Sequence, residues 1–207
     1  MTAMGRVIPV AWFCLSAIAC FAEQPMGELP IPRYQADTAD PPWLAYAARF
    51  HGHLGPWGIA GVRAGMAGRR AVEADGYFDI RVVAEGPWGK PPRSCFLDGL
   101  QVATGATLGK RNLEWIERDR IVVRVQNTQT GKSVIVRPTE MLMKLLTSFR
   151  PQPMARAAGR GDHPHQAGAQ RETLERIARK IARLGQSEIL YVQAARSEQA
   201  QRARDAD

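Results

Sequence analysis

The sequence predicts a single domain of the α+β class, in which a small mixed or antiparallel sheet packs against helices. The chain has 207 residues, enough for one domain and its ends, and its 45% hydrophobic content is ordinary for a globular protein. Two β-rich runs, 121–126 and 133–137, flank Thr130-Gly131 and predict a hairpin. A helix ending before Gly185 is predicted by four apolar residues at helical spacing: Leu174, Ile177, Ile181 and Leu184.

The N-terminus has the pattern of a secretory signal peptide over residues 1–22. Arg6 precedes an apolar run, and small residues offer a cleavage site after Ala22. Because the run is short for a membrane span, we expect an exported protein, periplasmic or secreted, without a transmembrane span after cleavage. Two alternatives stay open. One is a lipoprotein anchored at Cys20, which is disfavoured because Ala17 stands where such proteins usually have leucine. The other is an uncleaved anchor.

Cysteine usage limits the roles that a thiol can take. Cys14 and Cys20 lie in the predicted signal, so a protein cleaved after Ala22 keeps only Cys95. A single cysteine cannot form an internal disulfide. Cys95 is therefore a buried small residue, a metal ligand or a reactive thiol.

The mature chain is predicted to begin with a linker and a short helix. Residues 23–40 contain three prolines and predict an extended linker. Residues 41–50 predict a helix that Asp40 caps, with two prolines in its first turn. This helix leads directly to the histidines.

Two histidines, His51 and His53, stand two residues apart just before a second predicted helix. Side chains at this spacing share a face of an extended chain, so both imidazoles point the same way if the segment is extended. Pro56 suits the first position of a helix, whose N-terminus carries free N–H groups and a partial positive charge. Such a turn suits a metal or anion site, and the alternative is a polar turn with two solvated histidines.

The second predicted helix, residues 57–73, has glycines at three- and four-residue spacing. They leave one face of the helix nearly bare: Gly58, Gly61, Gly65 and Gly68. Such a face allows the close approach of another backbone or of a ligand. Tight packing between helices is the structural alternative.

A third predicted helix, residues 95–104, follows a strand at residues 80–84 and a loop rich in glycine and proline. Cys95 lies in the first turn of this helix. Asp98 and Gln101 are three and six residues further on and lie roughly on the same face of the helix as Cys95.

The loop after this helix, residues 104–112, contains two glycines, two threonines and a Lys-Arg pair. Thr104, Thr107 and Lys110 could bind an anion there. The spacing does not match the Walker A motif, so the loop does not indicate a nucleotide site.

The remaining chain predicts a short helix, a mobile loop, a last strand and a charged tail, over residues 138–146, 150–170, 189–192 and 195–207. His163 and His165 repeat the two-residue spacing in the loop. Their neighbours, Asp162 and Pro164, favour solvated histidines there over metal ligands.

The net charge of +8 comes from basic residues spread along the chain. A basic surface attracts anionic ligands or membranes, but solvated charge explains the same composition. The chain lacks the basic motifs with interleaved aromatic residues that typify nucleic-acid modules, so we expect no nucleic-acid partner.

Two stretches together resemble the family of formylmethanofuran dehydrogenase E-subunits. They are FHGHLGPWGIAGVRAG, from Phe50, and SCFLDGLQVATGATLGKRNL, from Ser94. The family patterns are an HGH-x-C-P-G turn, an S-C-x-x-D-A-x-Q helix start and a T-G-C-T-x-G-K-G-N-L loop. The resemblance covers about residues 43–194, and we place the domain at residues 41–194. It implies an α+β domain, often a homodimer, with a metal site near the histidine turn and the cysteine helix.

The chain departs from the family pattern at three positions. Gly55 and Ala106 stand where the family has cysteine, and Arg111 stands where it has glycine. The C-terminal zinc ribbon of some members is absent. His51, His53 and Cys95 remain as ligands for a divalent transition metal such as zinc, with one position open. Residues that could support the metal or bind a ligand are Asp98, Gln101, Thr104, Thr107 and Lys110.

Three functions are compatible with these observations. The first is a periplasmic or secreted protein that binds a metal, or a ligand through a metal, at His51, His53 and Cys95. The second is an enzyme of unknown substrate that uses a metal with an open position, or Cys95 with one of the histidines as nucleophile and base. The third is a structural or partner-binding relative with an emptied site, in which the glycine-rich helix serves dimer packing.

Overall fold

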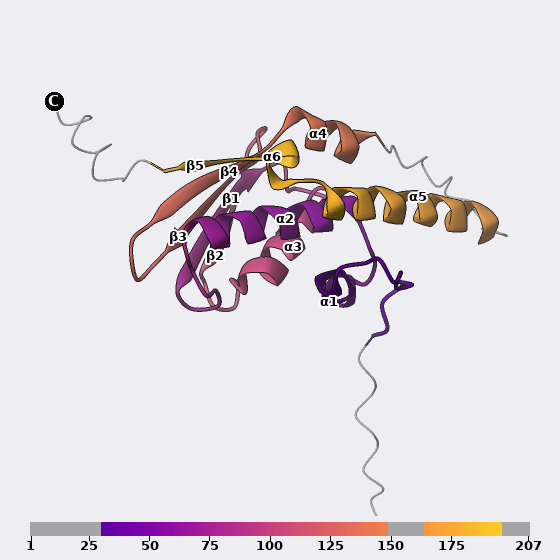
Figure 1. The fold of residues 1–207 in the computed structure, drawn as a ribbon, viewed down its shortest axis with the longest axis horizontal. Helices are drawn as coiled ribbons and strands as arrows, with labels where there is room; N and C mark the ends of the chain where they lie inside the picture. Colours follow the sequence, from indigo (N-terminus) through magenta and orange to yellow (C-terminus); the bar gives the residue numbers. More distant parts are fainter. Residues whose placement is uncertain (1–29, 149–163, 196–207) are drawn as a thin grey trace, which may run out of the picture. The chain divides into compact units, whose positions relative to one another are not determined.

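The computed structural model describes residues 30–148 and 164–195 and contains one five-stranded sheet with helices, which confirms the α+β class (Figure 1). The strand order is β2-β1-β3-β4-β5. β1 and β2 pair in parallel, and all other neighbours pair antiparallel. The strands are β1 Ile80–Gly86, β2 Leu113–Glu117, β3 Val122–Asn127, β4 Ser133–Pro138 and β5 Leu190–Ala194.

The predicted hairpin is confirmed as β3 and β4. Val125 pairs with Val134, and the Asn127 N–H donates to the Lys132 carbonyl at 2.9 Å. The Asn127 side-chain oxygen also accepts from the backbone N–H groups of Gln129 and Thr130. The side chain of Asn127 therefore organises the turn that its own backbone opens.

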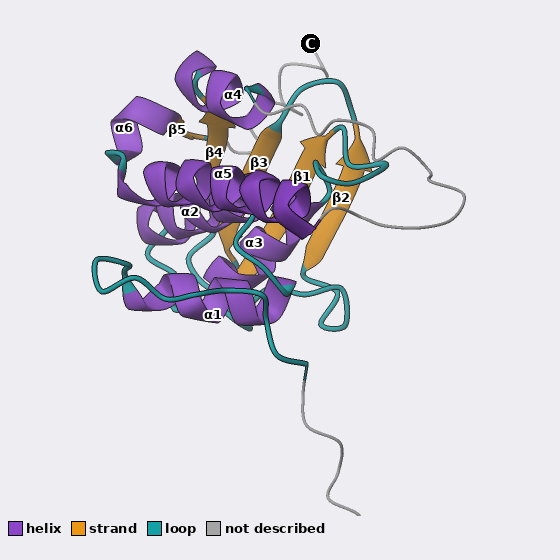
Figure 2. Cartoon of the chain, turned by 90° about the vertical axis from the view of Figure 1, so that its right-hand side faces the viewer, coloured by secondary structure: helices purple, strands orange, loops and turns teal. Residues whose placement is uncertain are grey.

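Six helices accompany the sheet in the described part of the chain, and in Figure 2 α2, α3 and α5 lie in front of it. α2 packs against β3, β4 and β5 on one side and against α3 and α5 on the other, so it forms the centre of the domain. Alternate residues of β1, β3 and β4 face this helix layer and are buried. The helices are α1 Pro42–His51, α2 Pro56–Ala71, α3 Cys95–Thr104, α4 Glu140–Thr147, α5 Pro164–Arg183 and α6 Gln186–Ile189.

Gly58, Gly61 and Gly65 of the glycine stripe of α2 face α3, whereas Gly68 faces Val125 and Val136 of the sheet. A Cβ added to Gly61 would overlap the Phe96 carbonyl oxygen, and one added to Gly99 would overlap the Gly58 carbonyl oxygen. The two helix backbones are therefore in direct contact, which is the tight-packing alternative for these glycines. This face of α2 is already covered within the chain, so it is not the surface for dimer packing.

Two further contacts fix the helices around the histidine turn. Trp88, buried in the loop after β1, stacks on Phe96 of α3 with a centroid distance of 5.1 Å, and its Nε1 donates to the Ala84 carbonyl. Arg63 of α2 donates three hydrogen bonds to the carbonyls at the end of α5, those of Ile181, Ala182 and Leu184. The first contact holds the start of α3, and the second holds α5 on α2.

The segment before α1 differs from the extended linker expected there. Asp40 does not cap α1, whose N-cap is Pro41 without a side-chain hydrogen bond. Its carboxylate instead accepts from the Tyr34 hydroxyl at 2.9 Å and from Arg179 Nε at 3.0 Å. Nε of Arg179, from α5, lies 3.0 Å from both carboxylate oxygens, so a charge-assisted contact with a guanidinium holds this carboxylate away from the helix start.

Two other parts of the fold differ from what the sequence predicted. No strand was expected at β2, an edge strand in which only Leu113 is buried, so its apolar residues do not alternate in and out. Residues 164–170 were expected in a loop, but they form the start of α5.

The signal peptide, most of the linker, His163, the rest of the predicted loop and the tail beyond residue 195 lie outside the described residues. In the part of the chain that is described, no helix is long and apolar enough to cross a membrane.

Candidate metal centre

Both histidines lie where α1 ends and turns toward α2. His51 is the last residue of α1, and Gly52 follows with a left-handed φ of 87°, its N–H donating to the Ala48 carbonyl. This backbone conformation suits glycine and reverses the chain at a helix end. The His51 and His53 rings lie 4.6 Å apart between centroids and are tilted by 39°. The imidazoles therefore meet, although through a helix end and a turn and not through the extended chain that we expected.

The segment before α1 holds His53 from the other side. Arg33 forms an isolated parallel β-bridge with His53, and its N–H donates to the Gly52 carbonyl at 2.7 Å. The backbone of the histidine turn is thus paired on one edge. This pairing gives the second imidazole a defined position.

Asp98, one turn into α3, fixes the orientation of His51. Its Oδ2 lies 2.7 Å from His51 Nδ1, and the His51 side chain is 13% exposed. The hydrogen bond to Asp98 and the neighbouring Cys95 thiol raise the pKa of His51 to about 9, although burial acts in the opposite direction. Burial and the charge of His51 lower the pKa of His53. In the absence of a metal at pH 7, His51 is therefore charged and His53 neutral.

The opposite nitrogen of His51, Nε2, has no hydrogen-bond partner in the part of the chain that the structure describes, although this atom is buried. Leaving a buried donor or acceptor unpaired costs about 1–3 kcal/mol. Such an atom is therefore a candidate for an interaction with a group that is not part of the chain.

The backbone of Gly55 lies close to both imidazoles. A Cβ built on Gly55 would lie 3.0 Å from His53 Nε2 and 3.8 Å from His51 Nε2. The family cysteine at this position would therefore bring its sulfur to the two imidazoles. With glycine at this position, no side chain of residue 55 supplies a donor to the two imidazoles.

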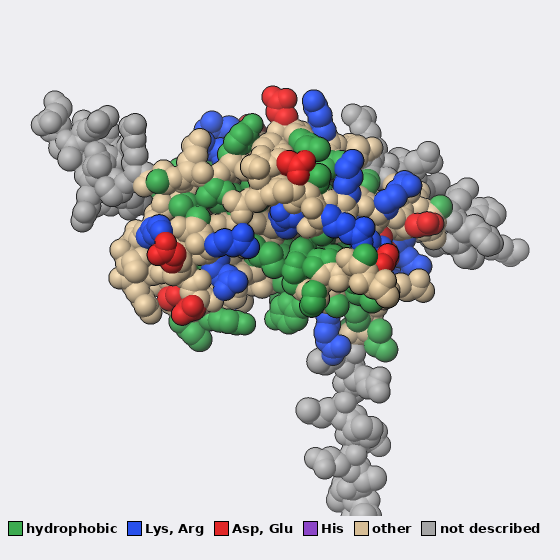
Figure 3. Space-filling model, viewed as in Figure 1, with side chains coloured by type: hydrophobic (Ala, Val, Ile, Leu, Met, Phe, Trp, Pro, Cys, Tyr) green, Lys and Arg blue, Asp and Glu red, His purple; other side chains and the backbone are tan. Residues whose placement is uncertain are grey.

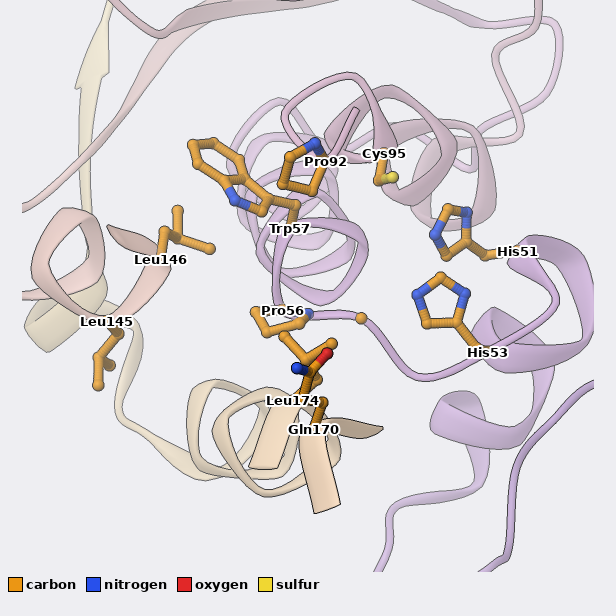
Figure 4. Close-up of a pocket in the computed structure, with 11 residues that line it drawn as sticks. His51, His53, Pro56, Trp57, Pro92, Cys95, Leu145, Leu146, Gln170 and Leu174 are labelled. Atoms are coloured by element: carbon orange, nitrogen blue, oxygen red, sulfur yellow. The ribbon is translucent and has the colours of Figure 1, made fainter. Parts of the chain in front are cut away.

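Cys95, the first residue of α3, is partly buried and lines the same cavity as His51, His53 and Gly55. Figure 4 shows its sulfur and both imidazole rings gathered at one side of a cavity. Two imidazoles and a thiol are the donors that Zn²⁺ prefers, and a carboxylate on the far nitrogen of a ligating histidine is its usual support. The donor set fits a metal. Within the described ranges, however, no three histidine, cysteine or acidic side chains stand in the arrangement of a formed metal site.

The cavity itself has a volume of about 140 Å³ and mostly apolar walls. The three donors and Gly55 lie at one side of it, and the apolar wall extends away from them. Residues from four parts of the chain form that wall: Pro56, Trp57, Pro92, Leu145, Leu146 and Leu174. Leu145 and Leu146 come from α4 and Leu174 from α5, and no local pattern in the sequence points to them as site residues.

The other predicted residues divide into two groups. Gln101 lines a second hollow together with His51, Asp98 and Cys95. Thr104 ends α3, about 14 Å from Cys95 by the helical rise of about 1.5 Å per residue. Thr104 and Thr107 are therefore at the far end of the helix from the histidines, in the loop that also contains Lys110.

This loop uses its polar groups internally. The Thr104 hydroxyl donates to the Leu100 carbonyl and accepts from the Ala106 N–H, and the Thr107 hydroxyl accepts from the Lys110 N–H. Ala106 is buried beside them. The second missing family cysteine was thus at the opposite end of α3 from Cys95, and its loss does not alter the surroundings of the histidines.

On the face of the described domain that Figure 3 shows, basic side chains lie in several places and do not form one continuous stripe. A family model described as "FmdE, Molybdenum formylmethanofuran dehydrogenase operon" matches residues 50–190, more than half of the chain. Residues of this chain are also 31% identical, over 99 residues, to a protein of Archaeoglobus fulgidus named "Probable S-adenosyl-L-methionine-binding protein". That alignment covers 45% of this chain and only 25% of the relative. The matched region thus spans about a quarter of the length of that protein.

Proposed function

The chain belongs to the FmdE family, and from this membership together with the geometry of the histidine turn we propose that the domain binds a divalent transition metal ion, zinc or a similar metal, through His51, His53 and Cys95. The observation that carries the proposal is that the two imidazoles and Cys95 line one cavity, while the buried His51 Nε2 has no hydrogen-bond partner among the described residues. A metal ion in this place would give the unpaired nitrogen its missing partner.

The residues around the donors support this role. Asp98 holds Nδ1 of His51, so that Nε2 is the nitrogen turned to the metal. Cys95 contributes a sulfur, and Gly55 contributes none. Three protein donors leave one position open, as in catalytic zinc sites, and a metal bound there supplies a Lewis acid that can bind a ligand or lower the pKa of water.

The name of the Archaeoglobus relative does not decide the ligand. S-adenosylmethionine carries charged and polar groups, whereas apolar side chains form most of the wall of this cavity. The volume of about 140 Å³ is also below the roughly 300–1,000 Å³ of pockets for drug-sized ligands. We therefore assign a metal to the site and not that cofactor.

Metal analysis tests the proposal directly. Protein purified without metal-chelating resins should contain close to one equivalent of a transition metal, and His53→Ala and Cys95→Ala should each lose most of it. Thr107→Val, at the far end of α3, is the matched control and should retain it. Equal metal content in all four proteins would refute the assignment.

Removal of the metal should also lower stability. A ligand at 100 times its Kd stabilises the folded state by about 2.7 kcal/mol, so a chelator should lower the melting temperature of the loaded protein by several degrees. The same chelator should leave the melting temperature of His53→Ala unchanged. If the chelator leaves the melting temperature of the metal-loaded wild type unchanged, this result would contradict a contribution of the metal to stability.

A thiol-dependent enzyme is a second candidate. The observation that favours it is the order Asp98, His51, Cys95, in which a carboxylate orients an imidazole that neighbours a thiol. In this case Cys95 of the metal-free protein should react with iodoacetamide near pH 7 faster than a free cysteine, and Asp98→Asn should slow the reaction. A metal-free Cys95 that does not react would exclude this candidate.

Export and self-association complete the proposal. The signal pattern of residues 1–22 supports an exported protein, and cleavage after Ala22 would leave Glu23 as the first residue of the mature form. Mass spectrometry of the exported protein should find this terminus, whereas a lipidated Cys20 would show the anchored form. Homodimerisation, which the family resemblance implies, is tested by light scattering of the purified domain.

A further inference from the structure

We infer that the free edge of β2 is the surface through which two copies of this chain pair, strand against strand, about a two-fold axis at Ile116. This inference rests on the proposed self-association and deepens it by naming the surface and the register. It does not depend on the metal site.

β2 is an edge strand, and no other strand of the described chain pairs with its outer side (Figure 2). The N–H of Arg118, directly after β2, donates to the Gly86 carbonyl of β1 at 2.9 Å. Since backbone groups alternate in direction along a strand, residues 114 and 116 also turn theirs to β1, whereas residues 113, 115 and 117 turn theirs outward. Such a row of N–H and C=O groups is a template for a strand of another chain.

Apolar side chains lie exposed on both sides of this edge. Trp115 is 48% exposed and lines a hollow on the helix side of the sheet together with Leu97 of α3 and Leu108, itself 58% exposed. Ile116 is 36% exposed and faces the opposite side, because successive side chains of a strand alternate. At the other edge of the sheet, described β5 has one exposed large hydrophobic residue, Tyr191. A strand that pairs with β2 therefore meets apolar surface on both of its faces, as the core of a protein interface requires.

The charges along β2 select one register for two antiparallel copies. A two-fold axis at residue 114 or 117 would place two glutamates against each other, and an axis at Trp115 would pair no charges. An axis at Ile116 instead places Glu114 of each copy opposite Arg118 of the other, on either side of a contact between the two Ile116 side chains. In the same register Trp115 and Glu117 exchange backbone hydrogen bonds across the axis. The strand is thus complementary to itself in charge, apolar contact and hydrogen bonding.

An ion pair within the chain already holds Glu114 at this edge. Its Oε1 accepts from Arg81 Nη2, on β1, at 2.7 Å. A carboxylate accepts more than one hydrogen bond, so this pair leaves Glu114 able to contact Arg118 of the second copy. The second contact then closes a chain of alternating charges across the two-fold axis.

Analytical ultracentrifugation over a range of protein concentrations tests the surface. Ile116→Lys places two lysines against each other at the axis, and Tyr191→Lys makes the same change at the opposite edge of the sheet as the matched control. We expect Ile116→Lys to raise the Kd of the dimer by about tenfold or more, and Tyr191→Lys to leave it within about twofold of the wild type. Both variants should keep the circular dichroism of the wild type, which separates a lost contact from a lost fold.

Disulfide cross-linking tests the register. With the axis at Ile116, the two copies of this residue form a non-hydrogen-bonded pair with Cα atoms about 4.5 Å apart, within the range of a disulfide. The two copies of Glu114 lie about 14 Å apart, four residues along the strands. Mild oxidation should therefore link Ile116→Cys into a covalent dimer and leave Glu114→Cys unlinked, and peptide mapping should find the bond between the two introduced thiols.

The outcomes separate this surface from the proposals on which it borders. A wild-type dimer that Ile116→Lys does not weaken, or that Tyr191→Lys dissociates, overturns the surface and leaves self-association standing. Equal cross-linking of Ile116→Cys and Glu114→Cys overturns the two-fold pairing at Ile116. A wild type that stays monomeric overturns both the surface and self-association. None of these results depends on bound metal, so this test and the metal analysis fail independently.

Discussion

Replacement of Arg63 by methionine should destabilise the domain strongly, because one guanidinium closes the end of α5. Its two terminal nitrogens donate to the carbonyls of Ile181, Ala182 and Leu184 at 2.9, 2.6 and 2.7 Å. The last carbonyls of a helix have no partner within the helix. Methionine keeps the apolar stem of Arg63 and removes all three donors, so the variant isolates the hydrogen bonds from the packing.

The magnitude follows from the number and kind of these bonds. A hydrogen bond to a charged group contributes about 1.5–3 kcal/mol, so three of them would contribute about 4–9 kcal/mol if they were independent. They share one donor group, and burial of the arginine lowers its pKa and costs free energy, which reduces the sum. We expect a loss of about 3–4 kcal/mol in the free energy of unfolding, near the cost of breaking a buried polar network.

Urea unfolding at pH 7 measures this loss, with Arg176→Met as the control. Arg176 is an exposed arginine of α5, and its replacement should change the free energy of unfolding by no more than about 0.5 kcal/mol. Arg63→Lys should recover only part of the loss, because an ammonium cannot span three carbonyls in the geometry of a guanidinium. A loss below about 1 kcal/mol for Arg63→Met would refute the role of Arg63 as the cap of α5.

Two further predictions concern packing and pH. Gly61→Ala should lower the free energy of unfolding in urea by about 3 kcal/mol or more, because its Cβ would overlap the Phe96 carbonyl. Gly58→Ala meets ordinary contacts at 3.7 Å and should be tolerated. Equal stabilities of the two variants would contradict the direct backbone contact of α2 and α3. Burial raises the pKa of Asp40, but hydrogen bonds from Tyr34, the Asp37 N–H and Arg179 outweigh it and hold the pKa below its ordinary value. The unfolded chain then binds the proton more readily, so this stabilisation is present above about pH 4 and is lost as the pH falls through the lower folded-state pKa. The urea midpoint of the wild type should therefore fall more steeply below about pH 4 than that of Asp40→Asn, and parallel curves would contradict the assignment.

Local patterns predicted the parts of the fold that depend on neighbours in the chain. Three elements have such a pattern: the β3–β4 hairpin, the glycine-rich α2 and the apolar stripe of α5. In each, the spacing of residues along the sequence matches the spacing of the side chains on the face that the element buries. β2 has no such signal. It is an edge strand whose parallel pairing with β1 joins segments about 30 residues apart.

The turn between the histidines shows how a correct expectation can rest on the wrong local structure. The spacing of His51 and His53 predicted that the imidazoles lie together, on the assumption of an extended chain. They do lie together, but Gly52 in a left-handed conformation ends α1 and turns the chain back. A glycine after a helical stretch is a C-cap signal, so this sequence feature could have indicated the turn.

The sequence alone determined which chemical groups this protein has for its site: two histidines, one cysteine outside the predicted signal, an aspartate one turn along the cysteine helix, and a glycine where the family has a thiol. The tertiary structure decided which of them meet. It pairs Asp98 with His51, places Gly55 beside both imidazoles, and places Thr104, Thr107 and Lys110 at the far end of α3. It also builds the cavity wall from α4 and α5. The histidine turn, α3, α4 and α5 are far apart in the chain, and helix packing, not any local pattern, sets the distances between their side chains.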